Sequence, residues 1–158
     1  SEDVQARLAV PHEMETFNRC KLDWSEGKKN RTLSDLHRDL IKLRREDSRL
    51  RLQSEGGIDG AVLRSQSFVL RYLSKESDDR LLVVNLGSRE DLTPAPEPLL
   101  APPPHCEWEI LWTSESQRYG GPGVVDIATD EKWILPAESA LVFRPRRRTR
   151  QRKQPKKR

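Results

Sequence analysis

The chain reads Arg80-Leu81-Leu82-Val83-Val84-Asn85-Leu86 near its middle. Its four consecutive apolar residues are typical of a strand that is covered on both faces. The preceding run, residues 67–73, differs because Phe68, Leu70 and Tyr72 alternate with their neighbours, which is the period of a half-buried strand. The two runs predict that this part of the chain forms a β-sheet.

Short apolar runs separated by turn residues continue to the end of this region, about every ten positions after Gly57. Six runs predict strands, at residues 60–64, 67–73, 80–86, 108–113, 132–135 and 139–144. Six or more strands in about 90 residues are typical of an antiparallel sandwich. We therefore predict a mainly β fold, with an antiparallel β-sandwich as the C-terminal domain at residues 55–145.

Upstream of the strands, one amphipathic helix is predicted at about residues 33–50. Its apolar stripe consists of leucines at helical spacing, namely Leu33, Leu36, Leu40, Leu43 and Leu50. Thr32 and Asp35 match a capping box, which predicts the start of the helix. Residues 1–31 show no sustained period, so we expect an irregular N-terminal segment with a short helical turn around residues 14–17.

The basic residues are concentrated in the C-terminal tail. The chain has 29 Lys and Arg against 25 Asp and Glu, a formal net charge of +4. Ten of the basic residues lie from Arg144 onward, with no acidic residue, so the rest of the chain carries a formal charge of −6. We expect residues 146–158 to be a disordered, solvated tail. The tail has no aromatic residue for base stacking, so the sequence does not favour nucleic acid as a partner.

The sequence offers no catalytic, cofactor or metal site. At 158 residues the chain is too short for a complete (β/α)₈ enzyme, which needs roughly 250 residues. Cys20 and Cys106 have neither metal-ligand spacing nor a histidine placed beside them, and two reduced thiols suit a cytoplasmic protein. No apolar run is long enough to span a membrane, and we expect neither a signal peptide nor a membrane partner.

The chain contains Thr16-Phe17-Asn18-Arg19-Cys20-Lys21-Leu22-Asp23-Trp24-Ser25-Glu26, followed by Asp35-Leu36-His37-Arg38-Asp39-Leu40-Ile41-Lys42-Leu43-Arg44-Arg45-Glu46. These segments resemble the end of the catalytic barrel in malto-oligosyltrehalose trehalohydrolases, members of the alpha-amylase superfamily. In that family, a Lys-Leu-Asp-Trp stretch leads into the last barrel helix, which ends in a Leu-Arg-Arg signature before an all-β C-terminal domain. Cys20 stands where the family usually has Ser.

The resemblance continues into the predicted strands and covers about residues 9–145. The runs at 79–87, 133–136 and 139–143 look like strands of the family's C-terminal domain, although branching enzymes share this β part more loosely. The resemblance implies that residues 1–54 are the end of a (β/α)₈ barrel, including its last helix. Its partner would be the upstream catalytic barrel of the same enzyme.

The activity that the resemblance implies is hydrolysis of the α-1,4 bond next to the terminal trehalose of a malto-oligosyltrehalose, which releases trehalose. Retaining glycosidases need two carboxylates about 5 to 5.5 Å apart. In the family these residues lie upstream of the Lys-Leu-Asp-Trp segment, and no residue here matches them. The chain is therefore expected to support an enzyme that binds malto-oligosaccharide without supplying its catalytic residues.

Two aromatic residues are candidate glucan contacts, Trp24 in the N-terminal segment and Tyr119 in the glycine-rich loop. Asp23 and Glu26, beside Trp24, are expected to make local polar contacts while Trp24 packs on the predicted helix. Trp108, Ile110 and Trp112 are expected on one side of a strand, in the core.

Other functions remain open from the sequence. The chain could be the C-terminal region of a 1,4-alpha-glucan branching enzyme or a stand-alone carbohydrate-binding β module. A basic-tailed nucleic-acid binder is a further class. Binding of maltoheptaose by the isolated chain would indicate the module, and salt-sensitive DNA binding would indicate the last class.

Overall fold

The structure, a computed structural model, describes residues 10–51, 56–94, 97–123, 127 and 132–148. Within these residues, the helices come first, at α2 (Met14–Arg19), α3 (Glu26–Lys29), α4 (Arg31–Glu46) and α5 (Ser48–Arg51). The strands follow, at β1 (Ile58–Arg64), β2 (Ser67–Tyr72), β3 (Arg80–Asn85), β4 (Glu90–Leu92), β5 (Cys106–Thr113), β6 (Trp133–Leu135) and β7 (Ser139–Arg147). Two 3₁₀-helices, η1 (Pro98–Leu100) and η2 (Gln117–Tyr119), lie in the connections.

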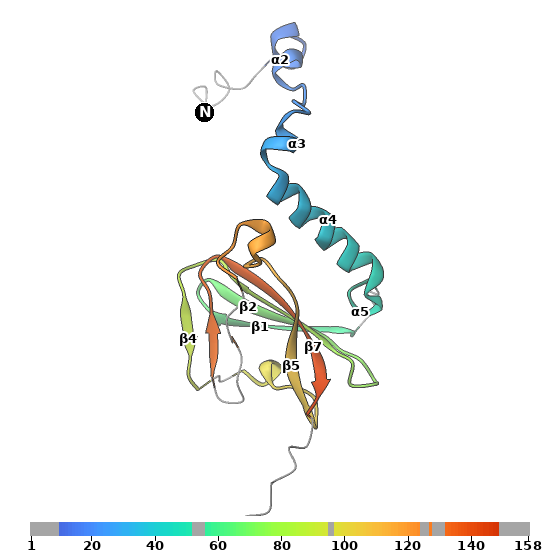
Figure 1. Cartoon of the computed structure of the whole chain (residues 1–158), viewed down its shortest axis with the longest axis vertical. Coiled ribbons are helices and arrows are strands. Elements are labelled where there is room, and N and C mark those ends of the chain that lie inside the picture. The colour runs from blue at the N-terminus through green and yellow to red at the C-terminus, as the bar shows by residue number, and fades with distance from the viewer. Residues whose placement is uncertain (1–9, 52–55, 95–96, 124–126, 128–131, 149–158) are drawn as a thin grey trace, which may run out of the picture.

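The strands form two antiparallel sheets, which confirms the predicted mainly β fold. One sheet has the strand order β1-β2-β3-β7-β5, and the other contains β4 and β6. Figure 1 shows α4 beside the strands of this β domain, with α2 and α3 extending away from it. The helical segment therefore contacts the β domain mainly through α4 and α5.

One hydrophobic core fills the space between the sheets. The larger sheet contributes Val69, Leu81, Val83, Leu141 and Phe143, and the smaller sheet contributes Leu92, Trp133 and Leu135. The apolar run at residues 81–84 lies in β3, which pairs with a strand on each side and is the central strand of the larger sheet. Leu82 and Val84 point away from the core and are only half-buried, so the outer face of the sheet is less well covered than the sequence predicted.

A β-bulge in β5 corrects the predicted placement of its aromatic residues. Ile110 pairs with the buried Phe143, whereas Trp112 pairs with Val142, and the register shifts between the two. Because Phe143 and Val142 are consecutive in β7, their side chains lie on opposite faces of the sheet. Trp108 and Ile110 therefore pack against the core, as predicted, but Trp112 lies on the outer face.

The helix boundaries also differ from the prediction. α4 runs from Arg31 to Glu46. The next residue, Asp47, has an extended backbone that separates α4 from α5. The predicted capping box does not form, because Thr32 and Asp35 already lie inside the helix. Asn30 is the N-cap residue, and its side chain makes no capping hydrogen bond. The Asp35 carboxylate instead pairs with Arg31 and Arg38.

Two segments predicted to be irregular have more structure than expected. The short helical turn expected at residues 14–17 is confirmed as α2, but α3 was not predicted. β7 continues to Arg147, so Arg146 and Arg147 belong to the strand rather than to a disordered tail. Their pairing with β5 explains the extension, because Glu107 lies opposite Arg146. The prediction for residues 149–158 lies outside the described residues.

Candidate docking interface

The helix α4 lies against the β domain with one side and exposes the other side. The leucines of the predicted stripe that lie within α4 are half-buried at positions 36, 40 and 43, whereas Leu33 is exposed. Leu36, Leu40 and Leu43 recur at helical spacing, so they form one side of α4. One side of the helix is thus partly covered, and two polar contacts fix it to the β domain.

The first contact joins α4 to the loop after β5. Tyr119 donates its hydroxyl proton to Asp39 Oδ2 at 2.6 Å and accepts a hydrogen bond from Trp112 Nε1 at 3.2 Å. Arg118 pairs with the same carboxylate at 3.2 Å. Burial, followed by the hydrogen bond to Asp39, raises the pKa of Tyr119, so the hydroxyl remains a donor. Tyr119, a candidate glucan contact from the sequence, is placed as a half-buried link to α4.

The glycines after Tyr119 allow this loop to fold back tightly. Gly120 has φ of 87°, a left-handed conformation that side chains with a Cβ rarely adopt. At Gly121, a Cβ would lie 2.4 Å from the backbone oxygen of Glu115. The sequence indicated a glycine-rich loop here, and its tight turn directs Tyr119 toward α4.

Tyr119→Phe is expected to lower the free energy of unfolding by about 1 kcal/mol, the net value of one hydrogen bond. The amides of α4 should also exchange with solvent faster, because the link to Asp39 is lost. Hydrogen exchange and urea denaturation would measure both effects. Tyr72→Phe is the control, since the Tyr72 hydroxyl has no hydrogen bond to any described residue. Equal exchange of α4 in the two variants would contradict the role given to Tyr119.

The second contact, at the junction of α4 and α5, depends on Asp47. Its Oδ1 accepts hydrogen bonds from the backbone N–H groups of Arg49 and Leu50, which caps α5. Its Oδ2 accepts a hydrogen bond from Arg80 Nε at 2.7 Å, and both side chains are about nine-tenths buried. Arg80 also donates to Asp78 Oδ1 at 2.7 Å. This ion-pair chain joins the end of α4 to the start of β3.

The ion-pair chain is expected to weaken in acid. Burial opposes the charged form of Asp78, but the hydrogen bond and charge of Arg80, together with Arg49, outweigh it and hold the Asp78 pKa below its usual 3.8. A carboxyl group with a depressed pKa contributes stability above its unfolded value and loses it as pH falls through the folded value. The melting temperatures of the native chain and Asp78→Asn should therefore converge below pH 3.8.

The control for this pH series is Asp59→Asn, because Asp59 lies on the exposed edge strand β1 and forms no ion pair with a described residue. Its melting temperature should follow that of the native chain at every pH. A constant difference between the native chain and Asp78→Asn from pH 6 to pH 2 would contradict the expectation.

Beyond α4, the N-terminal segment exposes its large apolar side chains. Trp24 is 85% exposed, so the predicted packing of Trp24 on the helix is not seen. The other exposed apolar residues of residues 10–51 are Val10, Met14, Phe17, Leu22, Leu33 and Ile41. A shallow, open depression on α4 is lined by Leu33, Ser34, His37, Arg38 and Ile41. We call these exposed apolar residues of residues 10–51 the docking interface.

Beside Trp24, the Asp23 carboxylate makes a local contact. Asp23 Oδ1 accepts a hydrogen bond from the backbone N–H of Ser25 at 2.9 Å, and the hydrogen bonds from Ser25 lower the Asp23 pKa. Glu26 begins the short helix α3.

Cys20 and Cys106 are free thiols. Within the described residues, no three His, Cys, Asp or Glu side chains gather as metal ligands would.

Comparison with known families identifies the β domain. Residues 55–142 match the family of domains of unknown function called DUF3459. The chain belongs to the DUF3459 family. DUF3459 domains are found at the C-terminus of alpha-amylase-family glycoside hydrolases. No curated protein sequence matches the chain. Among the described helices, none has the length and apolar character of a membrane span.

The DUF3459 match begins after α5 and includes nearly all of the β domain. The two contacts at Asp39 and Asp47 thus connect the DUF3459 region with the helix that precedes it. Sequence patterns did not indicate these contacts, because Asp39 and Asp47 lie far along the chain from the residues that they contact.

Proposed function

We propose that this chain is the non-catalytic C-terminal portion of a malto-oligosyltrehalose trehalohydrolase. The parent enzyme would hydrolyse the α-1,4 bond next to the terminal trehalose of malto-oligosyltrehalose and release trehalose. The DUF3459 match supports the class of parent enzyme. The Thr16 to Glu26 segment, with its likeness to the end of the trehalohydrolase barrel, supports the finer assignment.

The observation that carries the proposal is the exposed apolar surface of residues 10–46. Leu33 and Ile41 are 54% and 55% exposed on a helix whose other side is held by the β domain. Burial of a large apolar side chain stabilises a protein by roughly 1.5–3 kcal/mol. A surface of this kind suits the last helix of a barrel, which would bury one side on the β domain and the other on the barrel.

In this role the β domain holds α4 in place and takes no part in catalysis. Asp39 and Asp47 hold α4 at two points, eight residues apart along the helix. A short helix gains most of its stability from tertiary packing rather than from propensity. The DUF3459 domain would therefore keep the last barrel helix folded and correctly placed, and the parent enzyme would act in the cytoplasm.

The test is the coding sequence upstream of Ser1 and the activity of the complete protein. We expect a (β/α)₈ pattern with a nucleophilic Asp and an acid/base Glu. The complete protein should release trehalose from maltotriosyltrehalose, and the 158-residue chain alone should release none. Formation of α-1,6 branches on amylose would assign a branching enzyme instead. A stop codon or an unrelated domain upstream would overturn the proposal.

A further inference from the structure

A pocket lies where α5 meets the β domain, and it shares no residue with the docking interface. Figure 1 shows α5 beside the end of the β domain at which β1 begins. The pocket has a volume of about 520 Å³. Sites for small molecules in proteins have volumes of roughly 300–1,000 Å³. Its lining consists of Arg49 from α5, two glycines at 56–57 before β1, and residues 73–76 after β2. Three segments of the chain therefore meet around it.

The Arg49 guanidinium keeps donors that the described residues do not use. One Nη2 proton goes to Glu76 Oε2 at 2.9 Å. The Nε atom is buried without a hydrogen bond, and its ion pair with Asp78 Oδ2 is 3.6 Å long. A guanidinium has five N–H donors, and Nη1 makes no hydrogen bond with a described residue. Because the side chain is 26% exposed, a ligand in the pocket can reach these donors.

Lys75 and Ser74 add further donors to the same pocket. Lys75 is exposed and forms no ion pair with a described residue, whereas Glu76 is already paired with Arg49. The Ser74 hydroxyl oxygen accepts a hydrogen bond from the backbone N–H of Glu76 at 3.2 Å, which leaves its own proton for another acceptor. The lining thus carries two cations against one carboxylate and needs a ligand rich in acceptors.

From this arrangement we propose that the pocket binds a small organic phosphate whose carbon skeleton carries hydroxyl groups. Lys75, Arg49 and Ser74 donate to the phosphate oxygens, and hydrogen bonds between ionised groups are about twice as strong as neutral ones. Glu76 Oε1, which accepts no hydrogen bond from a described residue, receives a ligand hydroxyl. Leu73 is 46% exposed and contacts the carbon skeleton. The site is independent of the activity of the parent enzyme.

Neither a bare phosphate ion nor a neutral sugar uses the whole pocket. A phosphate ion is small beside a volume of about 520 Å³ and would leave Leu73 and Glu76 without a contact. A neutral sugar could bind Glu76, but its hydroxyls make weaker hydrogen bonds to cations than an ionised phosphate does. None of the described residues that line the pocket is aromatic, so a sugar ring has no surface on which to stack. A phosphorylated polyol combines both kinds of contact.

Binding at this place would also stabilise the junction between the helices and the β domain. A ligand held by Arg49 and Lys75 bridges α5 and the turn after β2. The same turn leads to Asp78, which belongs to the ion-pair chain between α4 and β3. A ligand that binds only the folded protein raises its stability by mass action. The melting temperature should therefore rise with the concentration of the ligand.

Calorimetry with the 158-residue chain tests the proposal with three probes, namely glucose 6-phosphate, glucose and inorganic phosphate. The native chain should bind glucose 6-phosphate more tightly than either of the other two. Lys75→Ala should weaken this binding about tenfold, because one charge-assisted hydrogen bond is lost. Lys75→Arg keeps the charge and should retain most of the affinity. Thermal denaturation should give the same order of ligands.

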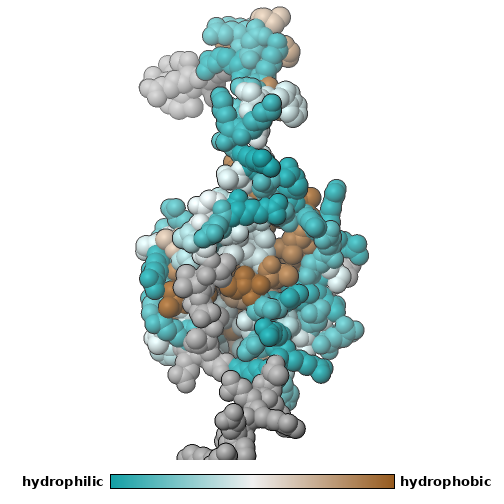
Figure 2. Space-filling model, in the orientation of Figure 1, coloured by the Kyte–Doolittle hydropathy of each residue, from teal (hydrophilic) through white to brown (hydrophobic). Residues whose placement is uncertain are grey.

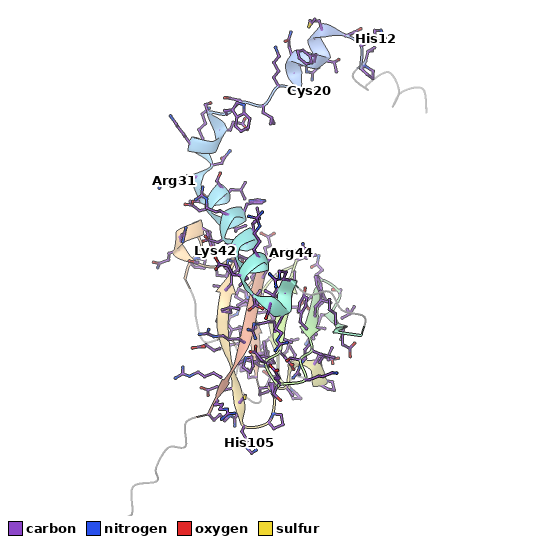
Figure 3. The ribbon with its side chains drawn as sticks, turned by 90° about the vertical axis from the view of Figure 1, so that its right-hand side faces the viewer. His12, Cys20, Arg31, Lys42, Arg44 and His105 are labelled. Carbon is purple, nitrogen blue, oxygen red and sulfur yellow. The ribbon has the colours of Figure 1, made fainter. Side chains whose placement is uncertain are left out.

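Lys42→Ala is the matched control, since Lys42 is exposed and has no ion pair with a described residue. It lies along α4 in Figure 3, outside the pocket, and Figure 2 shows that the outward surface of α4 is mainly hydrophilic. Lys42→Ala should bind glucose 6-phosphate like the native chain. Circular dichroism would check that all variants remain folded.

Four outcomes would overturn the proposal, and none of them touches the proposed function. The first is that the native chain does not bind glucose 6-phosphate, and the second is that Lys75→Ala binds it as tightly as the native chain. Binding of glucose as tight as that of glucose 6-phosphate would show that the phosphate makes no contact. Equally tight binding of inorganic phosphate would remove the roles given to Glu76 and Leu73.

Discussion

Arg71→Met is expected to lower the free energy of unfolding by about 3–5 kcal/mol, the cost of leaving one charge of a buried ion pair alone. Arg71 Nε and Nη2 lie 2.9 Å and 2.8 Å from Asp79 Oδ2, and the exposed fractions of the two side chains are only 13% and 7%. Arg71 Nη1 donates to the carbonyl oxygens of Leu99 and Ala101. The substitution would leave the Asp79 charge without its partner and detach the loop around η1.

Urea denaturation followed by circular dichroism would measure this loss. The Arg71 guanidinium lies over the Trp108 ring, 5.4 Å from its centroid. Methionine keeps most of the apolar part of the arginine side chain. Adding Asp79→Asn to Arg71→Met should recover part of the stability, because the second substitution removes the unpaired charge. A loss below about 1 kcal/mol for Arg71→Met would show that water reaches the site and replaces the arginine.

Phe143→Ala should have a similar effect, about 3–5 kcal/mol, through a cavity in the core. The Phe143 ring is 1% exposed and lies between Trp133 and Trp108, with centroid distances of 5.3 Å and 6.5 Å. Its removal would take contacts from both sheets at once, because Trp133 belongs to the smaller sheet.

The control for the core is Val62→Ala, since Val62 is 77% exposed on β1. Its free energy of unfolding should stay within about 0.5 kcal/mol of the native value. Urea denaturation of both variants would make the comparison. A loss for Phe143→Ala close to that of Val62→Ala would mean that the space between the sheets collapses around the missing ring.

The strands were predictable because apolar periodicity is a local signal. The run at residues 81–84 indicated a strand and is found in β3, and the other predicted runs were found with shifted ends. β4 was missed because Glu90–Leu92 has three residues and one apolar side chain, too few for a period. Its place comes from tertiary contacts, with Leu92 in the core and Glu90 accepting a hydrogen bond from Ser67.

The contacts of α4 could not be predicted, because they join residues far apart in the sequence. Asp39 and Tyr119 are 80 positions apart, and Arg80 lies 33 positions beyond Asp47. One local signal was available at Asp47, since an aspartate after a helix that is followed by Ser48 can begin a second helix. The sequence indicated Tyr119 only as an aromatic residue of a loop. In the structure, its hydroxyl group donates a hydrogen bond to Asp39.

The bulge in β5 gives the chain two optical probes on opposite layers. Trp108 contributes its emission from the core, where Nε1 donates to the Leu100 carbonyl oxygen, while Trp112 lies 6.1 Å from the Tyr119 ring on the side of α4. Detachment of α4 would expose Trp112 to water and shift its emission to longer wavelength, with Trp108 unaffected. Single-tryptophan variants would therefore distinguish release of the helix from melting of the β domain in the same titration.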